Sequence, residues 1–269
     1  MSTPVQINDL AIVLPAFNEE KDLPNLLVRI KETLVNQTFR YQVIVVDDGS
    51  RDRTAELAEA AAKDMPLRLI QHEVNGGLGA ALQTGLQAAM HVADAVLVMD
   101  SDNTHDPIYA IQMVKRLEME EAQLVIASRY QPGSQVQGLS IFRKALSLGC
   151  FLLMKTVVPF RNVRDYSTGF RCYHSSILKR LAQVYGETKL VEETGFVCML
   201  EVLLKLRTMG ISACEIPYIL RYDLKEGVSK LRIWRTLKRY LAVVNRYRDK
   251  RSEAALATVQ VAVSAVSQA

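Results

Sequence analysis

The chain has 269 residues, of which 49% are hydrophobic and 23% charged; this is typical of a folded globular protein and excludes a disordered, collagen-like or repetitive chain. A chain of that length buries a sizeable core without a disulfide or a zinc site. Its 33 Lys and Arg residues against 29 Asp and Glu residues give a net charge of +4, too small to indicate a nucleic-acid-binding protein.

Short apolar runs alternate along the first half of the chain with segments of helical periodicity. The apolar runs are residues 10–14, 42–46, 67–71, 95–99 and 124–127, and the helical segments between them are 22–36, 53–63, 78–92 and 107–118. This alternation predicts parallel strands joined by crossover helices. We therefore expect an α/β fold with a mostly parallel central sheet that helices cover on both faces.

After residue 128 the alternation weakens. The chain continues with a loop rich in Gly and Gln at 131–138, an apolar segment with basic residues at 141–160, and helical stretches near 176–184 and 194–209. We predict one α/β domain with an elaborated C-terminal half and a separate basic helix at its end.

Polar and conformationally unusual residues follow four of the predicted strands. They are Pro-Ala-Phe-Asn-Glu at 15–19, Asp-Asp-Gly-Ser at 47–50, Asn-Gly-Gly-Leu-Gly at 75–79 and Asp-Ser-Asp at 100–102. Ligands of parallel α/β sheets bind beyond the carboxyl ends of the strands. Because the coincidence recurs at four strand ends, we expect a ligand site at that edge of the sheet.

Asp100 and Asp102 follow a buried strand, and alternation places both carboxylates on the same side of the chain. Two neighbouring carboxylates repel each other, and a hard cation such as Mg²⁺, which binds one or two carboxylates together with phosphate oxygens, relieves the repulsion. A metal that bridges a diphosphate stabilises the charge of a departing nucleotide. The alternative is an acidic turn, after which Asp106 and Pro107 begin the next helix.

Asp48 lies just beyond another strand, where a carboxylate accepts hydrogen bonds from a base or a ribose hydroxyl in nucleotide-binding α/β folds. The alternative for this segment is helix capping, which is the role we favour for Ser50 and Asp52.

The glycines at 76, 77 and 79 resemble a phosphate-binding loop at a helix N-terminus. They have neither the spacing of a dinucleotide fingerprint nor the Gly-Lys-Thr of a P-loop, which disfavours a dehydrogenase or an NTPase. We expect this loop to pack closely beneath a nucleotide.

Six motifs occur together and in order along the chain. They are Pro-Ala-Phe-Asn-Glu at 15–19, Val-Val-Asp-Asp-Gly-Ser at 45–50 with Asp52 and Thr54, Asn-Gly-Gly-Leu-Gly-Ala at 75–80, Asp-Ser-Asp at 100–102, Ala-Ser-Arg-Tyr at 127–130 and Gly-Val-Ser-Lys at 227–230. On these residues the chain resembles family 2 glycosyltransferases of the GT-A fold, and within them the polyprenyl-phosphate sugar synthases such as the dolichol-phosphate mannose synthases. The resemblance covers residues 8–240.

The resemblance implies a nucleotide-diphosphate sugar donor such as GDP-mannose or UDP-glucose, a Mg²⁺ or Mn²⁺ cofactor, and inverting transfer to a polyprenyl phosphate. It implies a nucleoside pocket lined by Pro15, Phe17, Glu19, Val46 and Asp48. It places Asp100, Ser101 and Asp102 at the metal and diphosphate, with Asp100 and Asp102 as metal ligands and Asp102 also catalytic.

The resemblance also assigns roles to four cations. Arg129 lies near the donor sugar and diphosphate, Arg221 and Lys230 close over the diphosphate, and Arg143 meets the acceptor phosphate. Arg143 and Lys230 thereby join Asp102 as expected catalytic residues.

The chain departs from the family pattern at three points. Phe17 stands where a tyrosine is common, and Thr104 stands where relatives often have a metal-binding Gln, which leaves His105 or water as the third ligand. The spacing from Arg221 to Lys230 is longer than in the dolichol-phosphate mannose synthases.

The most basic part of the chain lies between residues 221 and 251, where 11 Lys or Arg residues stand against 3 Asp or Glu residues. Apolar residues alternate with these cations, which predicts an amphipathic helix in the interface of an anionic membrane, with Trp234 and Tyr240 at headgroup depth. The alternatives are a helix packed on its own domain or on a second copy in a homo-oligomer, and a nucleic-acid contact. The acidic strand ends and the lack of an aromatic platform disfavour nucleic acid.

The sequence also bears on location. The first nine residues form no secretory signal, and the longest apolar stretch, 145–160, contains Lys155 and falls short of the about 18 residues that cross a bilayer. The four cysteines form no CxxC pair, which indicates buried thiols in a reducing compartment. We expect a cytoplasmic protein on the cytoplasmic face of the membrane, without a transmembrane helix.

The resemblance, taken with the aspartate motif and the basic helix, implies a metal-dependent inverting glycosyltransferase with a polyprenyl-phosphate acceptor. We expect a catalytic domain at 1–230, its acceptor- and membrane-facing segment at 131–165, and a basic amphipathic helix and tail at 231–269. A phosphate acceptor is already a nucleophile and needs no general base. Two alternatives stay open: a hydroxyl acceptor on a lipid or glycan, with Glu192 or Glu193 as base, and a non-catalytic nucleotide-sugar-binding scaffold at the membrane.

Overall fold

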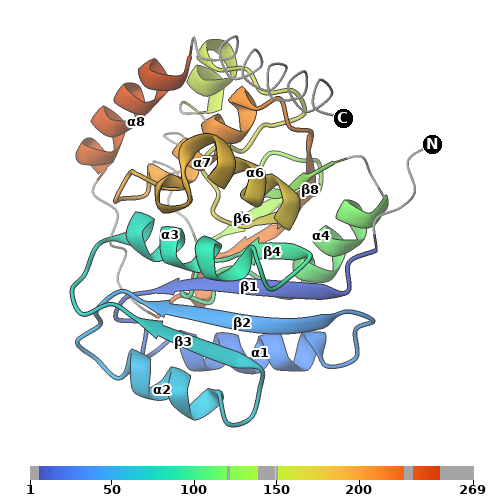
Figure 1. Ribbon diagram of the computed structural model, residues 1–269, viewed down its shortest axis with the longest axis vertical. Helices are drawn as coiled ribbons and strands as arrows, with labels where there is room; N and C mark the ends of the chain where they lie inside the picture. Colours follow the sequence, from blue (N-terminus) through green and yellow to red (C-terminus); the bar gives the residue numbers. More distant parts are fainter. Residues whose placement is uncertain (1–5, 120–121, 139–148, 150, 227–232, 249–269) are drawn as a thin grey trace, which may run out of the picture.

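The predicted alternation of strands and helices over the first 128 residues is confirmed. The computed structural model describes residues 6–119, 122–138, 149, 151–226 and 233–248. A seven-stranded sheet in the order β3-β2-β1-β4-β7-β5-β8 forms its centre (Figure 1). The strands are β1 (Asp9–Ala16), β2 (Arg40–Asp47), β3 (Leu67–Gln71), β4 (Ala95–Val98), β5 (Leu124–Ser128), β7 (Arg171–His174) and β8 (Ala213–Pro217). All neighbours pair in parallel except β7, which runs antiparallel to β4 and β5.

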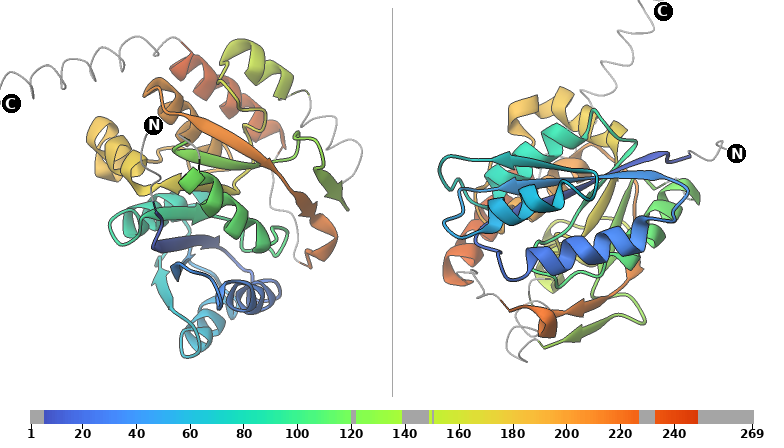
Figure 2. Two further views of the ribbon diagram at one scale, coloured as in Figure 1. Left: turned by 90° about the vertical axis from the view of Figure 1, so that its right-hand side faces the viewer. Right: turned by 90° about the horizontal axis from the view of Figure 1, so that it is seen from below.

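Helices cover both faces of this sheet, as expected from the sequence (Figures 1 and 2). The helices are α1 (Leu23–Leu34), α2 (Thr54–Ala61), α3 (Leu78–Ala89), α4 (Ile108–Met119), α6 (Ser175–Tyr185), α7 (Cys198–Thr208) and α8 (Ile233–Tyr247). Residues of α1, α2 and α4 share one hydrophobic core, and residues of α3, α6, α7 and α8 share the other. A sheet between two apolar layers requires strands that are apolar on both sides.

Strand β1 shows how the sequence meets that requirement. Leu10, Ile12 and Leu14 enter the core beneath α1 and α4. Ala11 and Val13 enter the opposite core beneath α3. Because successive side chains point to opposite faces, a strand buried on both faces reads as a continuous apolar run.

The structure adds strands that the periodicity did not predict. Strand β7 has four residues and begins with Arg171, whose buried guanidinium donates to the carbonyl oxygens of Met199 and Tyr166. Strand β8 pairs with β5, and a separate two-stranded sheet joins β6 (Gln135–Gln137) to β9 (Ile219–Arg221). Short strands with polar or charged members give too weak a period-two signal to be read locally.

The basic helix α8 packs on the protein itself. Tyr240, Val243, Val244 and Tyr247 are buried in the same core as α3 and α7. The expectation that Tyr240 lies at the depth of lipid headgroups is therefore wrong, since its side chain is covered by protein. Trp234 lies among residues whose side chains the structure does not describe.

The strand register sets the position of the site. Ala16 of β1 pairs with Asp47 of β2, and Asp47 pairs with Gln71 of β3. Val13 pairs with Val98 at the end of β4. The four polar segments predicted to bind a ligand thus leave the sheet at one edge.

Gly79, in the first turn of α3, makes a close backbone contact at that edge. Its N–H donates to the carbonyl oxygen of Thr194 (3.1 Å), and a Cβ at this position would overlap the carbonyl oxygen of Glu193. Glycine is therefore required for the α3 terminus to reach the 193–194 segment.

We predict that Gly79→Ala lowers the free energy of unfolding by about 1–3 kcal/mol, because the methyl group forces two backbone segments apart. Gly195→Ala is the matched control, since nothing lies within 4 Å of the position that a Cβ would take there. Urea unfolding of both variants is the measurement, and equal stability of the two would contradict the close approach.

Candidate functional site

The loop after β4 carries the two aspartates expected to bind a metal. Asp102 Oδ1 accepts hydrogen bonds from the Thr104 hydroxyl (2.6 Å) and the Thr104 backbone N–H (3.2 Å). The Ser101 hydroxyl donates to the carbonyl oxygen of Pro15 (2.8 Å), which ties the end of β4 to the end of β1. Asn103 has a left-handed backbone (φ 60°), which asparagine tolerates. The loop is thus held in one shape by its own polar groups.

Lys225 contacts the other carboxylate oxygen of Asp102, Oδ2. Its Nζ lies 2.5 Å from Asp102 Oδ2, and the side chains of Lys225 and Asp102 are 9% and 14% exposed. Burial alone would raise the pKa of Asp102, but the charge and hydrogen bond of Lys225 outweigh it and hold that pKa below its usual value. The Lys225 pKa is raised in turn by the carboxylates of Asp102 and Glu19, against the effect of burial.

Asp100 lies beside His105 rather than beside a lysine. Its backbone N–H donates to His105 Nδ1 (3.1 Å), and His105 Nε2 lies 3.8 Å from Asp100 Oδ2. The His105 ring is buried and stacks on Phe170 with 4.6 Å between centroids. Burial and the charge of Asp102 raise the pKa of Asp100, although His105 and Lys225 oppose that shift.

The two aspartates are compatible with Mg²⁺ or Mn²⁺ bound together with a phosphate ligand. Within the described residues no group of three or more His, Cys, Asp or Glu side chains is placed to hold a metal. Mg²⁺ does not need one, because it is commonly bound by one or two carboxylates with water and substrate phosphates. His105 Nδ1 already accepts a backbone hydrogen bond, so water or phosphate fits the remaining positions better than this nitrogen.

Asp48 fixes the glycine loop. Its carboxylate accepts hydrogen bonds from the N–H groups of Gly76 (3.0 Å) and Gly77 (2.7 Å), and His72 Nδ1 lies 2.7 Å from Asp48 Oδ1. With three such partners and 2% exposure, the carboxylate acts first as an anchor for the loop. A contact of Asp48 with a nucleoside remains a prediction.

The other residues expected at the nucleoside lie around the ends of β1 and β2. Glu19 is 9% exposed, and its backbone N–H donates to the Thr54 hydroxyl (2.8 Å). Pro15 is part of β1, and Phe17 follows the strand directly. Val46 lies fully buried in the hydrophobic core that also contains α3 residues, and its contact with a nucleoside remains a prediction.

Arg129 is held by a buried carboxylate. Its guanidinium donates to both oxygens of Asp165 (2.7 Å each), its backbone N–H donates to Asp165 Oδ2 (3.0 Å), and its NH2 group also donates to the Ser167 hydroxyl. Burial would raise the pKa of Asp165, but Arg129 holds it below the usual range. The expected role of Arg129 at the donor sugar remains a prediction.

Of the three remaining cations expected at the site, the structure describes Arg221. Arg221 forms a bidentate pair with Asp223, and its backbone N–H donates to the carbonyl oxygen of Thr104 (3.0 Å), which places β9 beside the aspartate loop. Arg143 and Lys230 lie outside the described residues.

The two glutamates of the hydroxyl-acceptor alternative are both ion-paired. Glu192 lies 2.9 Å from the Lys205 ammonium, which holds the Glu192 pKa below its usual value. Glu193 lies 3.2 Å from Arg239 and 3.6 Å from Arg246. The lowered pKa makes Glu192 a weaker base, while Glu193 is held between two arginines.

Three residues of the site were not predicted from the sequence: His72, Asp165 and Lys225. Asp165 begins the stretch Asp-Tyr-Ser-Thr-Gly-Phe-Arg at residues 165–171, which contains no strand-end or family motif named above. Lys225 stands in the basic stretch but is separated from Asp102 by 123 positions, so no local pattern connects the two.

Residues 11–182, more than half of the chain, match the sequence profile of "Glycosyl transferase family 2". The chain belongs to glycosyl transferase family 2. This confirms the resemblance read from the six motifs.

Curated relatives of this family 2 chain include polyprenyl-phosphate sugar enzymes. A dolichol-phosphate mannosyltransferase of Pyrococcus furiosus is 27% identical over 238 residues, which cover 88% of this chain and 63% of the relative. A polyprenol monophosphomannose synthase of Mycolicibacterium smegmatis is 28% identical over 223 residues, 82% of this chain and 80% of the relative. A dodecaprenyl-phosphate galacturonate synthase of Rhizobium johnstonii is 30% identical over 186 residues, 68% and 53%. The chain thus spans less than two thirds of the first and third of these relatives.

Solved structures confirm the fold. Glucosyl-3-phosphoglycerate synthase of Mycobacterium tuberculosis, in complex with Mn²⁺ and UDP-glucose, matches with a TM-score of 0.66 and 21% identity, over 90% of this chain and 79% of that one. A complex of the same enzyme with Mg²⁺ and UDP matches with a TM-score of 0.63.

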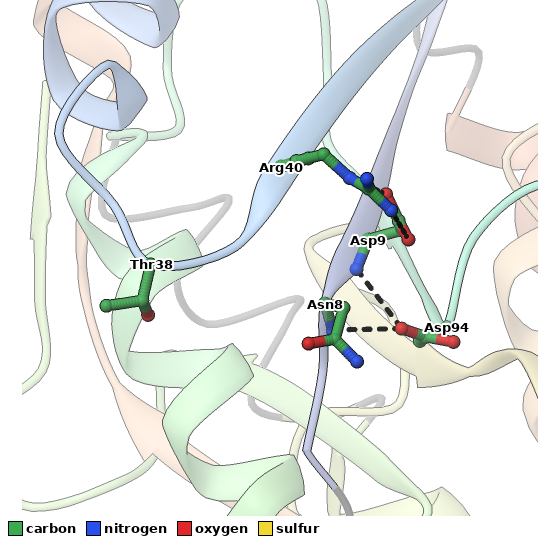
Figure 3. Close-up of a pocket in the computed structure, with 5 residues that line it drawn as sticks. All are labelled: Asn8, Asp9, Thr38, Arg40 and Asp94. Atoms are coloured by element: carbon green, nitrogen blue, oxygen red, sulfur yellow. Dashed lines mark hydrogen bonds and ion pairs between the residues drawn. The ribbon is translucent and has the colours of Figure 1, made fainter.

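A surface pocket lies at the opposite end of the strands. Figure 3 shows its lining residues, Asn8, Asp9, Thr38, Arg40 and Asp94. Asp94 Oδ2 accepts from the backbone N–H groups of Asn8 and Asp9, and Arg40 pairs with Asp9 at the surface. The pocket is therefore at the amino end of β1 and β2, away from the aspartate loop.

We predict that Asp165→Ala lowers the free energy of unfolding by about 3–5 kcal/mol, because it leaves the buried Arg129 guanidinium without its counter-ion. Asp9→Ala, which breaks the exposed pair with Arg40 (81% exposed), is the control and should cost at most about 1 kcal/mol. Urea unfolding near neutral pH is the measurement.

The difference in stability between wild type and Asp165→Ala should become smaller at low pH. The Asp165 pKa is depressed in the folded protein, so the stability that it contributes is present above its unfolded value of 3.8 and is lost as the pH falls through the lower folded value. A difference between wild type and Asp165→Ala that grew in acid would contradict this ion pair.

Proposed function

We propose that this family 2 protein is an inverting glycosyltransferase that moves a hexose from a nucleotide-diphosphate sugar, GDP-mannose or UDP-glucose, to a polyprenyl phosphate at a membrane surface. The observation that carries the proposal is the aspartate loop, in which Asp100 and Asp102 lie at the carboxyl edge of the sheet beside the ends of β1 and β9. The curated relatives named for mannosyl and galacturonosyl transfer to polyprenyl phosphates support the choice of acceptor.

On the donor side, Asp100 and Asp102 would hold a Mg²⁺ or Mn²⁺ ion, which would neutralise charge on the leaving diphosphate. Ser101 keeps the backbone of the aspartate loop against Pro15, which holds the loop in place for the donor. Pro15, Phe17, Glu19, Val46 and Asp48 form the nucleoside pocket. The ions in the complexes of the Mycobacterium tuberculosis enzyme support the use of a divalent cation in this fold.

Cations of the C-terminal half complete the donor site. Arg129 faces the donor sugar, and Arg221 and Lys230 close over the diphosphate. Arginine binds phosphate through two parallel charge-assisted hydrogen bonds, which suits it to this position.

The acceptor supplies its own nucleophile. A phosphate oxygen attacks the anomeric carbon from the face opposite the leaving nucleotide diphosphate, the bond from that carbon to the diphosphate breaks, and the configuration inverts. Arg143 holds the acceptor phosphate, so the protein contributes position and charge rather than a base. The ion pair with Lys205 makes Glu192 a weaker base, which favours this acceptor over a hydroxyl.

The membrane-facing surface is proposed from exposed apolar and basic residues at one end of the molecule. Residues 151–157 form a helix that exposes Leu152 (55%), Leu153 (41%) and Val157 (38%). This helix lies beside α8 (Figure 2), and Arg207 joins the two by donating to the carbonyl oxygens of Pro159 and Tyr247. In the part of the chain that the structure describes, no helix has the length and hydropathy to cross a bilayer.

We propose that residues 1–230 form the catalytic domain, with 131–165 facing the acceptor and membrane, and that 231–269 add the basic helix and tail. The core residues of α8 would then join the two parts through one hydrophobic cluster.

We predict that Asp102→Asn abolishes sugar transfer, with a loss of at least about a hundredfold in kcat, because the metal loses a charged ligand. Product analysis with radiolabelled GDP-mannose and UDP-glucose and a polyprenyl-phosphate acceptor measures this, while circular dichroism checks the fold. Transfer at the wild-type rate would refute the metal assignment, and donor binding without any turnover in the wild type would favour a scaffold.

We predict that the double variant Leu152→Gln/Leu153→Gln binds vesicles of anionic phosphatidylglycerol about tenfold or more weakly, because each inserted leucine contributes about 1.5–3 kcal/mol. Val28→Gln/Val35→Gln is the control, since these side chains are 55% and 63% exposed at α1, on the other face of the sheet. Vesicle sedimentation measures the binding, and equal loss in both variants would exclude a specific membrane face.

A further inference from the structure

The ammonium group of Lys225 contacts a carboxylate oxygen of Asp102, one of the two residues proposed to bind the metal. Asp102 Oδ1 is engaged by the hydroxyl and backbone N–H of Thr104, and Asp102 Oδ2 is engaged by Lys225 Nζ (2.5 Å). Both oxygens of this carboxylate therefore have partners within the protein.

Lys225 is held there by the chain around it. It directly follows the short helix η2 (Tyr222–Leu224), and the N–H of the next residue, Glu226, donates to Asp22 Oδ1 (3.0 Å). Asp22 is itself 1% exposed, so the segment is anchored on a buried group at the start of α1. The lysine side chain is 9% exposed and also lies in the field of Glu19.

The charges explain why a lysine is placed there. Three carboxylates, those of Glu19, Asp100 and Asp102, interact electrostatically with the Lys225 ammonium. Among the described residues, Lys225 is the lysine that forms an ion pair with one of them, Asp102. An ammonium and a divalent cation on the same carboxylate oxygen repel each other, so one must leave as the other binds.

We propose that Lys225 is a tethered counter-ion that a divalent cation must displace from Asp102, so that the free protein binds metal weakly and binds it well only together with a donor diphosphate. The diphosphate gives the displaced ammonium a new anionic partner, and metal and donor then bind cooperatively, each raising the affinity for the other. The inference rests on the metal site of the proposed function. It adds Lys225 to that site and predicts that metal and donor bind cooperatively.

The test is titration of the full-length, donor-free protein with Mn²⁺, followed by electron paramagnetic resonance of the unbound ion. We expect Lys225→Met to bind Mn²⁺ roughly ten- to a hundredfold more tightly than wild type, the factor expected for removing a competing charge-assisted contact. Lys225→Arg keeps the charge and should stay within about threefold of wild type. Lys115→Met is the matched control, since it removes the same charge from the exposed face of α4 and should leave Mn²⁺ affinity unchanged.

The cooperativity gives a second expected result. Addition of UDP or GDP should tighten Mn²⁺ binding in wild type and should do so much less in Lys225→Met, because the competing contact is already gone. Unchanged or weaker Mn²⁺ binding by donor-free Lys225→Met overturns the inference while leaving the metal site intact. If Asp102→Asn binds Mn²⁺ as tightly as wild type, the metal site of the proposed function fails instead.

A measurement on the wild-type protein covers the case in which Lys225→Met does not fold. Acetylation of Lys225 by an amine-reactive reagent, followed by mass spectrometry, reports whether its amine is covered. We expect Mg²⁺ at saturating concentration to speed acetylation of Lys225 and to leave that of Lys115 unchanged. Equal rates at Lys225 with and without bound Mg²⁺ would show that the metal does not displace the lysine.

Discussion

Parallel pairing of β1 with β2 and β4 brings the carboxyl ends of these strands to one edge of the sheet. The chain places an acidic residue after each of them, so Glu19, Asp48, Asp100 and Asp102 converge on one region. Negative charges gathered in a partly buried volume repel one another and resist ionisation unless each is compensated. The rest of the site is arranged around that electrostatic requirement.

The compensation differs from one carboxylate to the next. Two backbone amides of the glycine loop and His72 satisfy Asp48, so this charge holds the loop rather than attracting an ion. Asp102 is neutralised by Lys225 and Asp165 by Arg129. Lys225 comes from the segment after β9, so the charge balance of the aspartate loop is reached only when the C-terminal half has folded onto the N-terminal half.

Helix α8 connects the proposed membrane face to the same edge of the sheet. Arg239 pairs with Glu193 and donates to the Thr194 hydroxyl, and the Thr194 carbonyl oxygen accepts the N–H of Gly79. The Gly77 N–H, two residues earlier, donates to Asp48. The helix predicted to be basic and amphipathic thus also supports the glycine loop.

The sequence by itself determined the first five strands, the helices between them and the edge at which the polar segments meet, because hydrophobic periodicity and strand-end position are local properties. It also determined the aspartate motif and the family. Only the tertiary structure decided that Lys225 reaches Asp102, that Asp165 holds Arg129, that Asp48 is occupied by the glycine loop and that Tyr240 is buried. Strands β7 and β8 belong to this second group, since β7 is four residues long with a charged first member. These features depend on pairing between residues distant in sequence, where no local pattern specifies which partner the folded chain will present.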